Sequence, residues 1–322
     1  MPNAWQMEQD LTESPFINNL GKTIFILPKS KNEYYLFYIF QDSGIASGGG
    51  DTMKNGLYYS IVNMALDGGM GDLETSPVRV PVDYHTFRSL AAVKNNDNDY
   101  WLVASDMVNF YSFRVRSGII SSPVLSPSHA LHIYNGHGGA SFVLKSSTSG
   151  AMLISLSWFF LPGSYRTPDT TYNNVCVYDF DKNTGIVSNH DFIINQTTTS
   201  PKGIDYNMYF DATFSPNDSL IYVSNLTLPY ILQFQRYAPD VKNSKIKIPA
   251  PLGLGGIQLG PDGKIYTIIY NEADFSISVI NYPDIIGTGC KLSLGAVRLD
   301  SNQIYYYGTL FPTIFVTVQQ QI

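Results

Sequence analysis

The feature that most constrains the fold is a short hairpin pattern that recurs along the chain. In "GGIQLGPDGKIYTI" (255–268), two apolar segments flank Pro261-Asp262-Gly263, where proline fixes φ and glycine permits a positive φ. "FDATFSPNDSLIYVS" (210–224) repeats the arrangement around Pro216-Asn217-Asp218. A single hairpin is marginally stable in water, whereas a periodic series of hairpins predicts a repeat architecture.

Looser copies of the hairpin occupy residues 23–40, 90–105 and 141–157, and each copy is followed by two further strand-like segments. The chain is rich in residues that suit strands and turns, with 23 Tyr, 18 Phe, 26 Gly and 18 Pro. No convincing stretch has apolar residues at helical spacing. The sequence therefore predicts an all-β chain, a β-propeller of four-stranded antiparallel blades. Five complete blades are expected in one domain spanning residues 1–322, with starts near 23, 89, 141, 209 and 255.

Segments such as "VYDFDKNTGIVSN", "ATFSPNDSLIYVS" and "IQLGPDGKIYTI", taken in order, resemble a known family. They are similar to the YVTN/WD-like propeller domain of surface and secreted proteins from gliding bacteria that use type IX secretion. The resemblance implies a cell-surface or secreted location. It departs at both ends. Nothing here corresponds to the family's signal peptide and first blade, and "YYYGTLFPTIFVTVQQQI" (305–322) stands where the family ends in a stretch like "GLPNF". We expect residues 303–322 to close the ring, which would hold six blades or an incomplete set of seven.

Charge and hydropathy exclude several classes of partner. The formal net charge is -6 and no run of Lys or Arg occurs, which argues against nucleic acid as a partner. No apolar stretch approaches the roughly 20 residues of a membrane-spanning helix, so no membrane span is expected. Cys176 and Cys290 are expected to be buried free thiols. We expect a monomer.

Two motifs suggest metal binding at first sight. The histidines of "HALHIYNGHGG" (129–139) have no defined ligand spacing and no carboxylate close in sequence. "DFDKNTG" (179–185) resembles the start of a calcium loop, but such a loop needs Gly and Glu where this chain has Thr184 and His190. Connecting loops explain both motifs better, so neither a metal nor a cofactor is predicted.

Catalysis remains an alternative to binding at this point. The chain has no Gly-x-Ser-x-Gly motif for a nucleophilic serine. Propeller enzymes of the lactonase or lyase type use acidic and amide side chains in the central channel. Such side chains are concentrated near the start of the fourth unit, at Asp205, Asn207 and Asp211.

The preferred hypothesis is a non-enzymatic binding or scaffolding module whose loop-rich rim takes a protein or a glycan. The rim is formed by loops that join the fourth strand to the next blade and by loops between second and third strands. These loops are unusually aromatic, and aromatic and Arg side chains suit recognition. A long insertion at 158–172 is the strongest candidate. The predicted ligand-binding residues are Tyr84, His85, His132, Tyr134, Trp158, Phe159, Tyr165, Arg166 and Tyr206.

Overall fold

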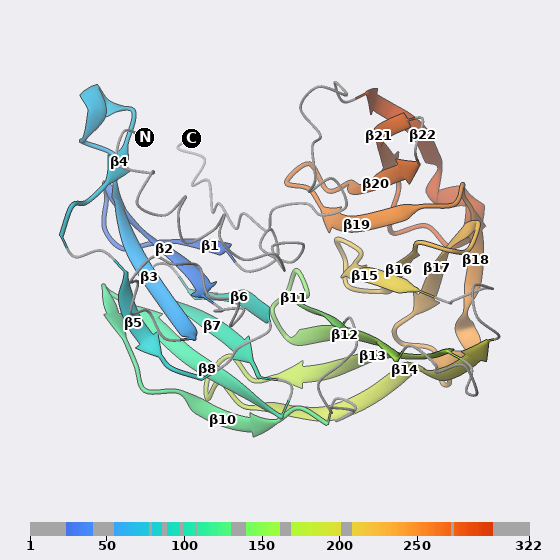
Figure 1. Ribbon diagram of the computed structural model, residues 1–322, viewed down its shortest axis with the longest axis horizontal. Helices are drawn as coiled ribbons and strands as arrows, with labels where there is room; N and C mark the ends of the chain where they lie inside the picture. The colour runs from blue at the N-terminus through green and yellow to red at the C-terminus, as the bar shows by residue number, and fades with distance from the viewer. Residues whose placement is uncertain are drawn as a thin grey trace. The chain divides into compact units, whose positions relative to one another are not determined.

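The structure is a computed structural model. It describes residues 24–40, 55–76, 79–85, 89–96, 99–106, 108–129, 140–161, 169–200, 208–271 and 274–298. These residues fall into two compact units. The first unit takes the described residues of Met1–Ser128 and Lys182–Ile186, and the second takes those of His129–Asp181 and Val187–Phe311. Each unit is built from antiparallel sheets (Figure 1).

The first unit holds two sheets, each with one extra short strand. In the first sheet, the order is β1-β2-β3-β4, and β5 also pairs with β3. Its strands are β1 (Ile24–Pro28), β2 (Glu33–Phe40), β3 (Gly56–Asn63), β4 (Asp72–Leu73) and β5 (Val80–Asp83), with the 3-10 turn η2 (Asp67–Gly69) before β4. In the second sheet, the order is β6-β7-β8-β10, and β9 also pairs with β8. Its strands are β6 (Ser89–Asn96), β7 (Asp99–Ser105), β8 (Asn109–Arg116), β9 (Ile119–Ile120) and β10 (Val124–Pro127).

The second unit holds three sheets of four strands, each paired in sequence order. The third sheet has β11 (Ala140–Ser146), β12 (Met152–Leu161), β13 (Asp169–Phe180) and β14 (Val187–Ser200). The fourth has β15 (Tyr209–Phe214), β16 (Leu220–Asn225), β17 (Tyr230–Gln235) and β18 (Ile246–Pro249), with η3 (Lys242–Ser244) before β18. The fifth has β19 (Leu254–Leu259), β20 (Ile265–Asn271), β21 (Asp274–Ile280) and β22 (Leu292–Arg298), with η4 (Gly287–Cys290) before β22.

The Pro-Asp-Gly and Pro-Asn-Asp turns that define the repeat each have a positive φ at the third residue and are closed by a backbone hydrogen bond. Gly263 has a φ of +74° and donates its N–H to the carbonyl of Gly260 at 3.1 Å. In the related turn, Asp218 takes the positive φ of +60° and donates to Ser215 at 3.0 Å. Asp tolerates this conformation better than most residues. The side chain of Asn217 supports the turn by accepting the N–H of Ser219 at 2.9 Å.

Neighbouring sheets bury their apolar faces against each other. In the first unit, one cluster combines the first sheet with the second and includes Leu27, Phe37, Leu90, Leu102 and Phe113. In the second unit, the third and fourth sheets share one cluster, and the fourth and fifth share another. Each sheet therefore needs a neighbour to cover its face, which is the packing of propeller blades.

A polar seam adds to the packing between the fourth and fifth sheets. Gln233 on β17 donates to the carbonyl of Ile285 at 3.0 Å and accepts the N–H of Gly287 at 2.7 Å. Tyr222 on β16 donates its hydroxyl to the carbonyl of Pro283 at 2.7 Å. The segment between β21 and β22 is thereby fixed to the sheet before it.

The predicted fold class is confirmed. The described residues form five antiparallel sheets with four strands in sequence or near-sequence order, as in propeller blades. Their first strands begin at Ile24, Ser89, Ala140, Tyr209 and Leu254. The expected insertion at 158–172 is shorter than predicted, because β12 continues to Leu161 and β13 begins at Asp169. The expected ring-closing residues 303–322 lie outside the described residues. No helix in the described part of the chain is long and apolar enough to cross a membrane.

Candidate functional site

A buried ion pair joins the first strands of three successive sheets in the second unit. The Nζ of Lys145 on β11 lies 2.9 Å from the Oδ2 of Asp211 on β15. Lys145 also donates to the carbonyl oxygen of Ile257 on β19, and Asp211 accepts the N–H of Ile257 at 3.0 Å. The other oxygen of Asp211 accepts the N–H of Ala212 at 2.8 Å. The two opposite charges are therefore paired within the group.

Asp211 was the one predicted channel acid that the structure describes, since Asp205 and Asn207 lie outside the described residues. Only 4% of its side chain is exposed, and 8% of that of Lys145. Burial lowers the pKa of Lys145, an effect that the neighbouring Asp211 carboxylate opposes. The carboxylate of Asp211 accepts hydrogen bonds from one ammonium group and two backbone amides. Asp211 therefore serves to connect neighbouring strands.

The first unit carries an aromatic cluster where the chain passes from β5 to β6. Tyr84 is 57% exposed, and its ring meets the buried ring of Tyr58 edge-on, with centroids 6.3 Å apart. Tyr58 also contacts Phe40 edge-on at 6.4 Å. Tyr58 thus supports the exposed Tyr84, and Phe40 in turn supports Tyr58. We call Phe40, Tyr58, Tyr84, His85 and Tyr111 the rim cluster.

His85 extends the rim cluster toward the second sheet. Its ring lies 4.6 Å from that of Tyr111 on β8, and its Nδ1 contacts the carboxylate of Asp83. Asp83 also accepts the N–H of His85 at 2.9 Å. The His85 side chain is 54% exposed. Its ring is therefore oriented by two neighbours while much of its surface faces solvent.

Tyr111 forms the buried base beneath His85. Its hydroxyl donates to Asp106 at 2.9 Å, and Asp106 in turn accepts the N–H groups of Val108 and Asn109. Burial, with the hydrogen bond to the Asp106 carboxylate as a further cause, raises the pKa of Tyr111 to about 12. Tyr111 thus stays protonated as a donor at neutral pH, and it holds the loop between β7 and β8 against the rim cluster.

Gly56 allows the rim cluster to form. A Cβ atom at this position would lie closer to the carbonyl oxygen of Asp83 than Cβ atoms lie to other atoms in real proteins. It would also lie 3.2 Å from the Cα of Tyr84. Both contacts are with backbone atoms, which have little freedom to move. The absent side chain at the start of β3 therefore lets the segment that carries Tyr84 and His85 pass close by.

The remaining predicted ligand-binding residues are distributed differently. Trp158 on β12 is half-buried and packs against the core cluster of the third and fourth sheets. Phe159 is described only by its strand position, opposite Ala140. Their role in binding stays a prediction. Five further candidates lie outside the described residues: His132, Tyr134, Tyr165, Arg166 and Tyr206.

The motifs that first suggested metal binding have other partners. Asp179 accepts a hydrogen bond from Asn189 at 2.9 Å, and His129 stacks on His190 with ring centroids 4.2 Å apart. His132 and His137 lie outside the described residues. Within the described ranges, no group of three or more His, Cys, Asp or Glu side chains could hold a metal ion.

Sequence reasoning missed Lys145, which is the partner of Asp211. A signal was present, since Lys145 is the only charged residue in "ASFVLKS", a segment otherwise suited to an inner strand. A charge in such a segment needs a buried partner. The partner lies 66 residues further along the chain, so spacing could not identify it.

No family model matches the chain, and no curated protein matches it. Solved structures are similar at low identity. A protein of unknown function from Dyadobacter fermentans has a TM-score of 0.46 at 11% identity, with 84% of this chain and 79% of that chain covered. A protein from Lactobacillus plantarum has a TM-score of 0.43 at 11% identity, with 89% of this chain and 86% of that chain covered. A putative 6-phosphogluconolactonase from Bacteroides uniformis has a TM-score of 0.37 at 13% identity, with 88% of this chain and 85% of that chain covered.

Proposed function

We propose that the protein is a non-enzymatic binding module that takes a protein or a glycan partner on the rim cluster. The observation that carries the proposal is the presentation of Tyr84 and His85. Both side chains are more than half exposed, and each rests on a buried tyrosine. A side chain already held in place loses little conformational entropy when a partner binds, which favours its use as an anchor.

The surroundings of the two side chains support recognition further. Val108, in the loop that Asp106 organises, is 52% exposed. An exposed tyrosine, a histidine with a carboxylate partner and an apolar residue combine contact area with hydrogen-bonding groups. This combination is typical of binding surfaces, where Tyr is enriched.

The setting of Asp211 supports binding over catalysis. A catalytic carboxylate needs access to substrate, whereas Asp211 is buried and bonded to Lys145 and Ile257. Hydrolysis of sugar lactones by the purified protein, lost in Asp211→Asn while the fold is retained, would instead favour an enzyme of the lactonase or lyase type.

Binding is tested by screening the purified protein on glycan and protein arrays and by titrating any hit. We expect Tyr84→Ala to weaken binding by about tenfold or more, since central aromatic anchors often contribute over 1 kcal/mol. Tyr237→Ala is the matched control, because Tyr237 is 70% exposed but lies on the second unit, after β17. Equal binding by wild type, Tyr84→Ala and His85→Ala, or no ligand at all, would contradict the assignment.

The location of the module is part of the same proposal. The resemblance to propellers of surface and secreted bacterial proteins supports a place at the cell surface or outside the cell, as a monomeric module. Fractionation of the source cells followed by immunodetection tests the location, and light scattering after gel filtration tests the oligomeric state. Detection in the cytoplasm alone would contradict the proposed location.

A further inference from the structure

Exposed apolar side chains of the second sheet lie beside the rim cluster. Leu125 on the outer strand β10 is 60% exposed, and it lies directly opposite Tyr111 on β8. Side chains that are directly opposite on antiparallel strands share a face, with Cβ atoms about 5 Å apart. The ring of His85 also lies 4.6 Å from the ring of Tyr111. The buried Tyr111 therefore adjoins two exposed side chains, of which one follows β5 and the other lies on β10.

Val108 brings a third exposed side chain to this surface. It is 52% exposed, and its N–H donates to the carboxylate of Asp106 at 2.8 Å. Its carbonyl oxygen accepts the N–H of Ser128, just after β10, at 2.9 Å. The backbone on both sides of Val108 is thus held, so the side chain is positioned before a partner binds. We call the following residues the junction patch: Asp83, His85, Val108, Tyr111 and Leu125.

The polar groups of Tyr111 and Asp106 are already paired within the protein. The Tyr111 hydroxyl donates to one oxygen of Asp106, and the other oxygen accepts the N–H groups of Val108 and Asn109. The side chains of Val108 and Leu125 have no hydrogen-bonding atoms. Glycan hydroxyl groups covered by these two side chains would lose water without gaining partners, which is unfavourable. An apolar side chain gains free energy from the same burial, so the surface suits a protein better than a glycan.

The charge of the junction patch indicates what accompanies the apolar side chain. Oδ1 of Asp83 accepts the N–H of His85 at 2.9 Å and contacts the His85 ring, whereas Oδ2 has no hydrogen bond within the described part of the chain. The Asp83 side chain is 16% exposed. Among the described residues, neither Asp83 nor Asp106 forms an ion pair with Lys or Arg. A cationic side chain on the partner would therefore meet a complementary charge.

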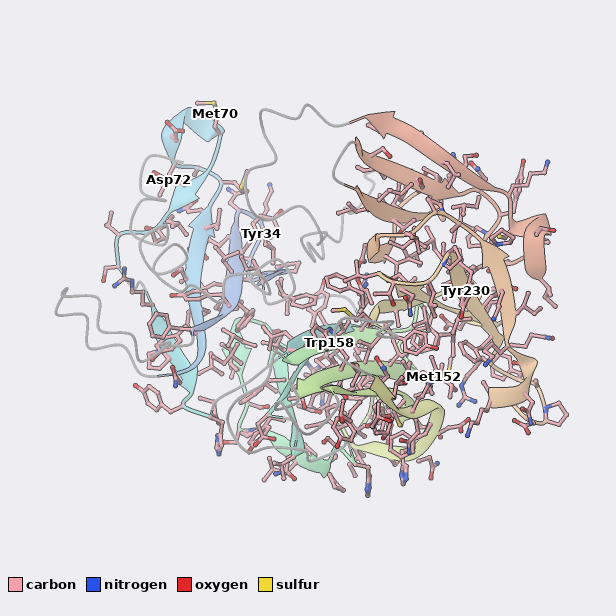
Figure 2. All side chains as sticks on the ribbon, turned by 45° about the vertical axis from the view of Figure 1, so that its right-hand side comes forward. Tyr34, Met70, Asp72, Met152, Trp158 and Tyr230 are labelled. Carbon is pink, nitrogen blue, oxygen red and sulfur yellow. The ribbon has the colours of Figure 1, made fainter. Side chains whose placement is uncertain are left out.

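Tyr230 on β17, labelled in Figure 2, shows the opposite arrangement. The Nζ of Lys247 lies 4.4 Å from the centroid of the Tyr230 ring, so the chain itself supplies the cation there. At the junction patch, the side chains of His85 and Tyr111 each contact a carboxylate instead. The chain thus provides negative charge at this surface, and the complementary positive charge belongs on the partner.

We propose that the junction patch binds a protein segment that carries an apolar side chain next to a Lys or Arg side chain. The apolar side chain packs against Leu125 and Val108, and the cationic group pairs with Asp83. The assignment rests on the proposed binding function of the rim cluster, because the two surfaces share His85 and Tyr111. It narrows the partner from a protein or a glycan to a protein of this chemistry.

The test uses the full chain and fluorescently labelled heptapeptides of alanine and glycine that carry one leucine or tryptophan next to one arginine. Matched peptides carry glutamate in place of the arginine. Fluorescence polarisation measures the dissociation constants. We expect saturable binding, with the arginine peptides bound about threefold more tightly than the glutamate peptides or better. Added salt should reduce this difference, because salt screens the attraction between exposed charges.

Two variants test the two halves of the contact. Leu125→Ser should weaken binding of the arginine peptides by about fivefold, since it removes apolar surface that the peptide covers. Asp83→Asn should weaken binding by about threefold and abolish the preference over the glutamate peptides. Asn can still accept the N–H of His85, so the backbone turn is kept in this variant.

Ile119→Ser is the matched control and should leave peptide binding unchanged. Ile119 on β9 is 71% exposed and belongs to the same sheet as Leu125. It lies opposite Arg116, whose side chain alternates onto the other face of β8 from that of Tyr111. Circular dichroism and thermal melting confirm that each variant folds.

Equal affinity for the arginine and glutamate peptides, or an equal loss in Leu125→Ser and Ile119→Ser, would overturn the assignment of this partner. Absence of saturable peptide binding would overturn it as well, and so would a glycan whose binding is lost in both Tyr84→Ala and Leu125→Ser. These results leave the rim cluster itself standing as a binding site. If every ligand found on the arrays binds equally to wild type, Tyr84→Ala and His85→Ala, the proposed function fails, and the assignment of this partner fails with it.

Discussion

Lys145 and Asp211 form an ion pair of 2.9 Å between the first strands of adjacent sheets, with both side chains almost fully buried. Because Ile257 offers its carbonyl to the lysine and its N–H to the carboxylate, the pair also includes the first strand of the next sheet. The pair thus links β11, β15 and β19 through two side chains.

Removing both members of this pair should cost less than the sum of the two single removals. Lys145→Met leaves an uncompensated buried carboxylate, and Asp211→Asn leaves a buried ammonium group, so each should cost about 3–5 kcal/mol of unfolding free energy. The double variant should cost clearly less than the sum. Urea denaturation of all four proteins provides the double-mutant cycle, and strict additivity would contradict the coupling.

Gly185→Ala should destabilise the first unit. A Cβ at Gly185 would lie 2.5 Å from a ring carbon of Trp101, whose Nε1 donates to the carbonyl of Lys182 at 2.7 Å. The glycine also has a φ of +78°, which is strained for alanine. We expect a loss of about 1–3 kcal/mol, measured by thermal melting, with a shift in tryptophan emission.

Gly118→Ala separates the clash from the backbone strain. Gly118 also has a φ of +78°, but the nearest atom to its Cβ position is the Tyr35 hydroxyl at 3.9 Å. The difference in melting temperature between the two variants therefore reports the contact with Trp101. Equal destabilisation would show that only the backbone conformation matters at Gly185.

Asp99 should make stability depend on pH in the acidic range. Hydrogen bonds from Arg114, at 2.9 and 2.6 Å, hold the pKa of the Asp99 carboxyl below its usual value. A depressed folded pKa means that this stabilisation is full above the unfolded pKa, near 4, and is lost as the pH falls through the folded value. Wild type should lose more stability than Asp99→Asn between about pH 5 and pH 2. Parallel curves of melting temperature against pH would argue against this role.

Asp218 should hold the turn between β11 and β12 onto the fourth sheet. Its carboxylate accepts the N–H groups of Thr148 and Ser149 at 2.7 and 2.9 Å. Asp218→Ala should lower the free energy of unfolding by about 1–3 kcal/mol. It removes both acceptor oxygens and places alanine at a positive φ, which alanine tolerates poorly. Asp218→Asn should cost less, since Asn retains one acceptor oxygen and tolerates that backbone conformation. Equal losses in urea denaturation would show that the amide bonds contribute little.

The blades could be predicted because each is specified locally. The Pro-Asp-Gly and Pro-Asn-Asp turns and the strands that flank them lie within about fifteen residues, so pairing follows from short-range pattern. The length of β12 and β13 was missed, since the aromatic and Thr-rich residues beyond Ser157 resemble an exposed loop as much as a strand. β12 and β13 pair over ten registered positions, so these residues extend the sheet instead.

The candidate site could be predicted only for residues whose type and position in a loop indicate binding. Tyr84 and His85 were identified in this way. Their supports Tyr58 and Tyr111 were not, because each lies within a strand pattern that resembles ordinary core. The partnership of Lys145 with Asp211 depends on how sheets pack. Such contacts are set by tertiary geometry, which spacing along the chain does not encode.

The seam between the fourth and fifth sheets has a consequence for how the chain could be divided. Gln233 and Tyr222 on one side and the segment from Pro283 to Gly287 on the other are complementary halves of a joint. The chain itself joins these two sheets once, through the segment from Pro249 to Leu254. Fragments separated at that link would each keep a recognition half, and we expect them to reassemble in solution as a split protein.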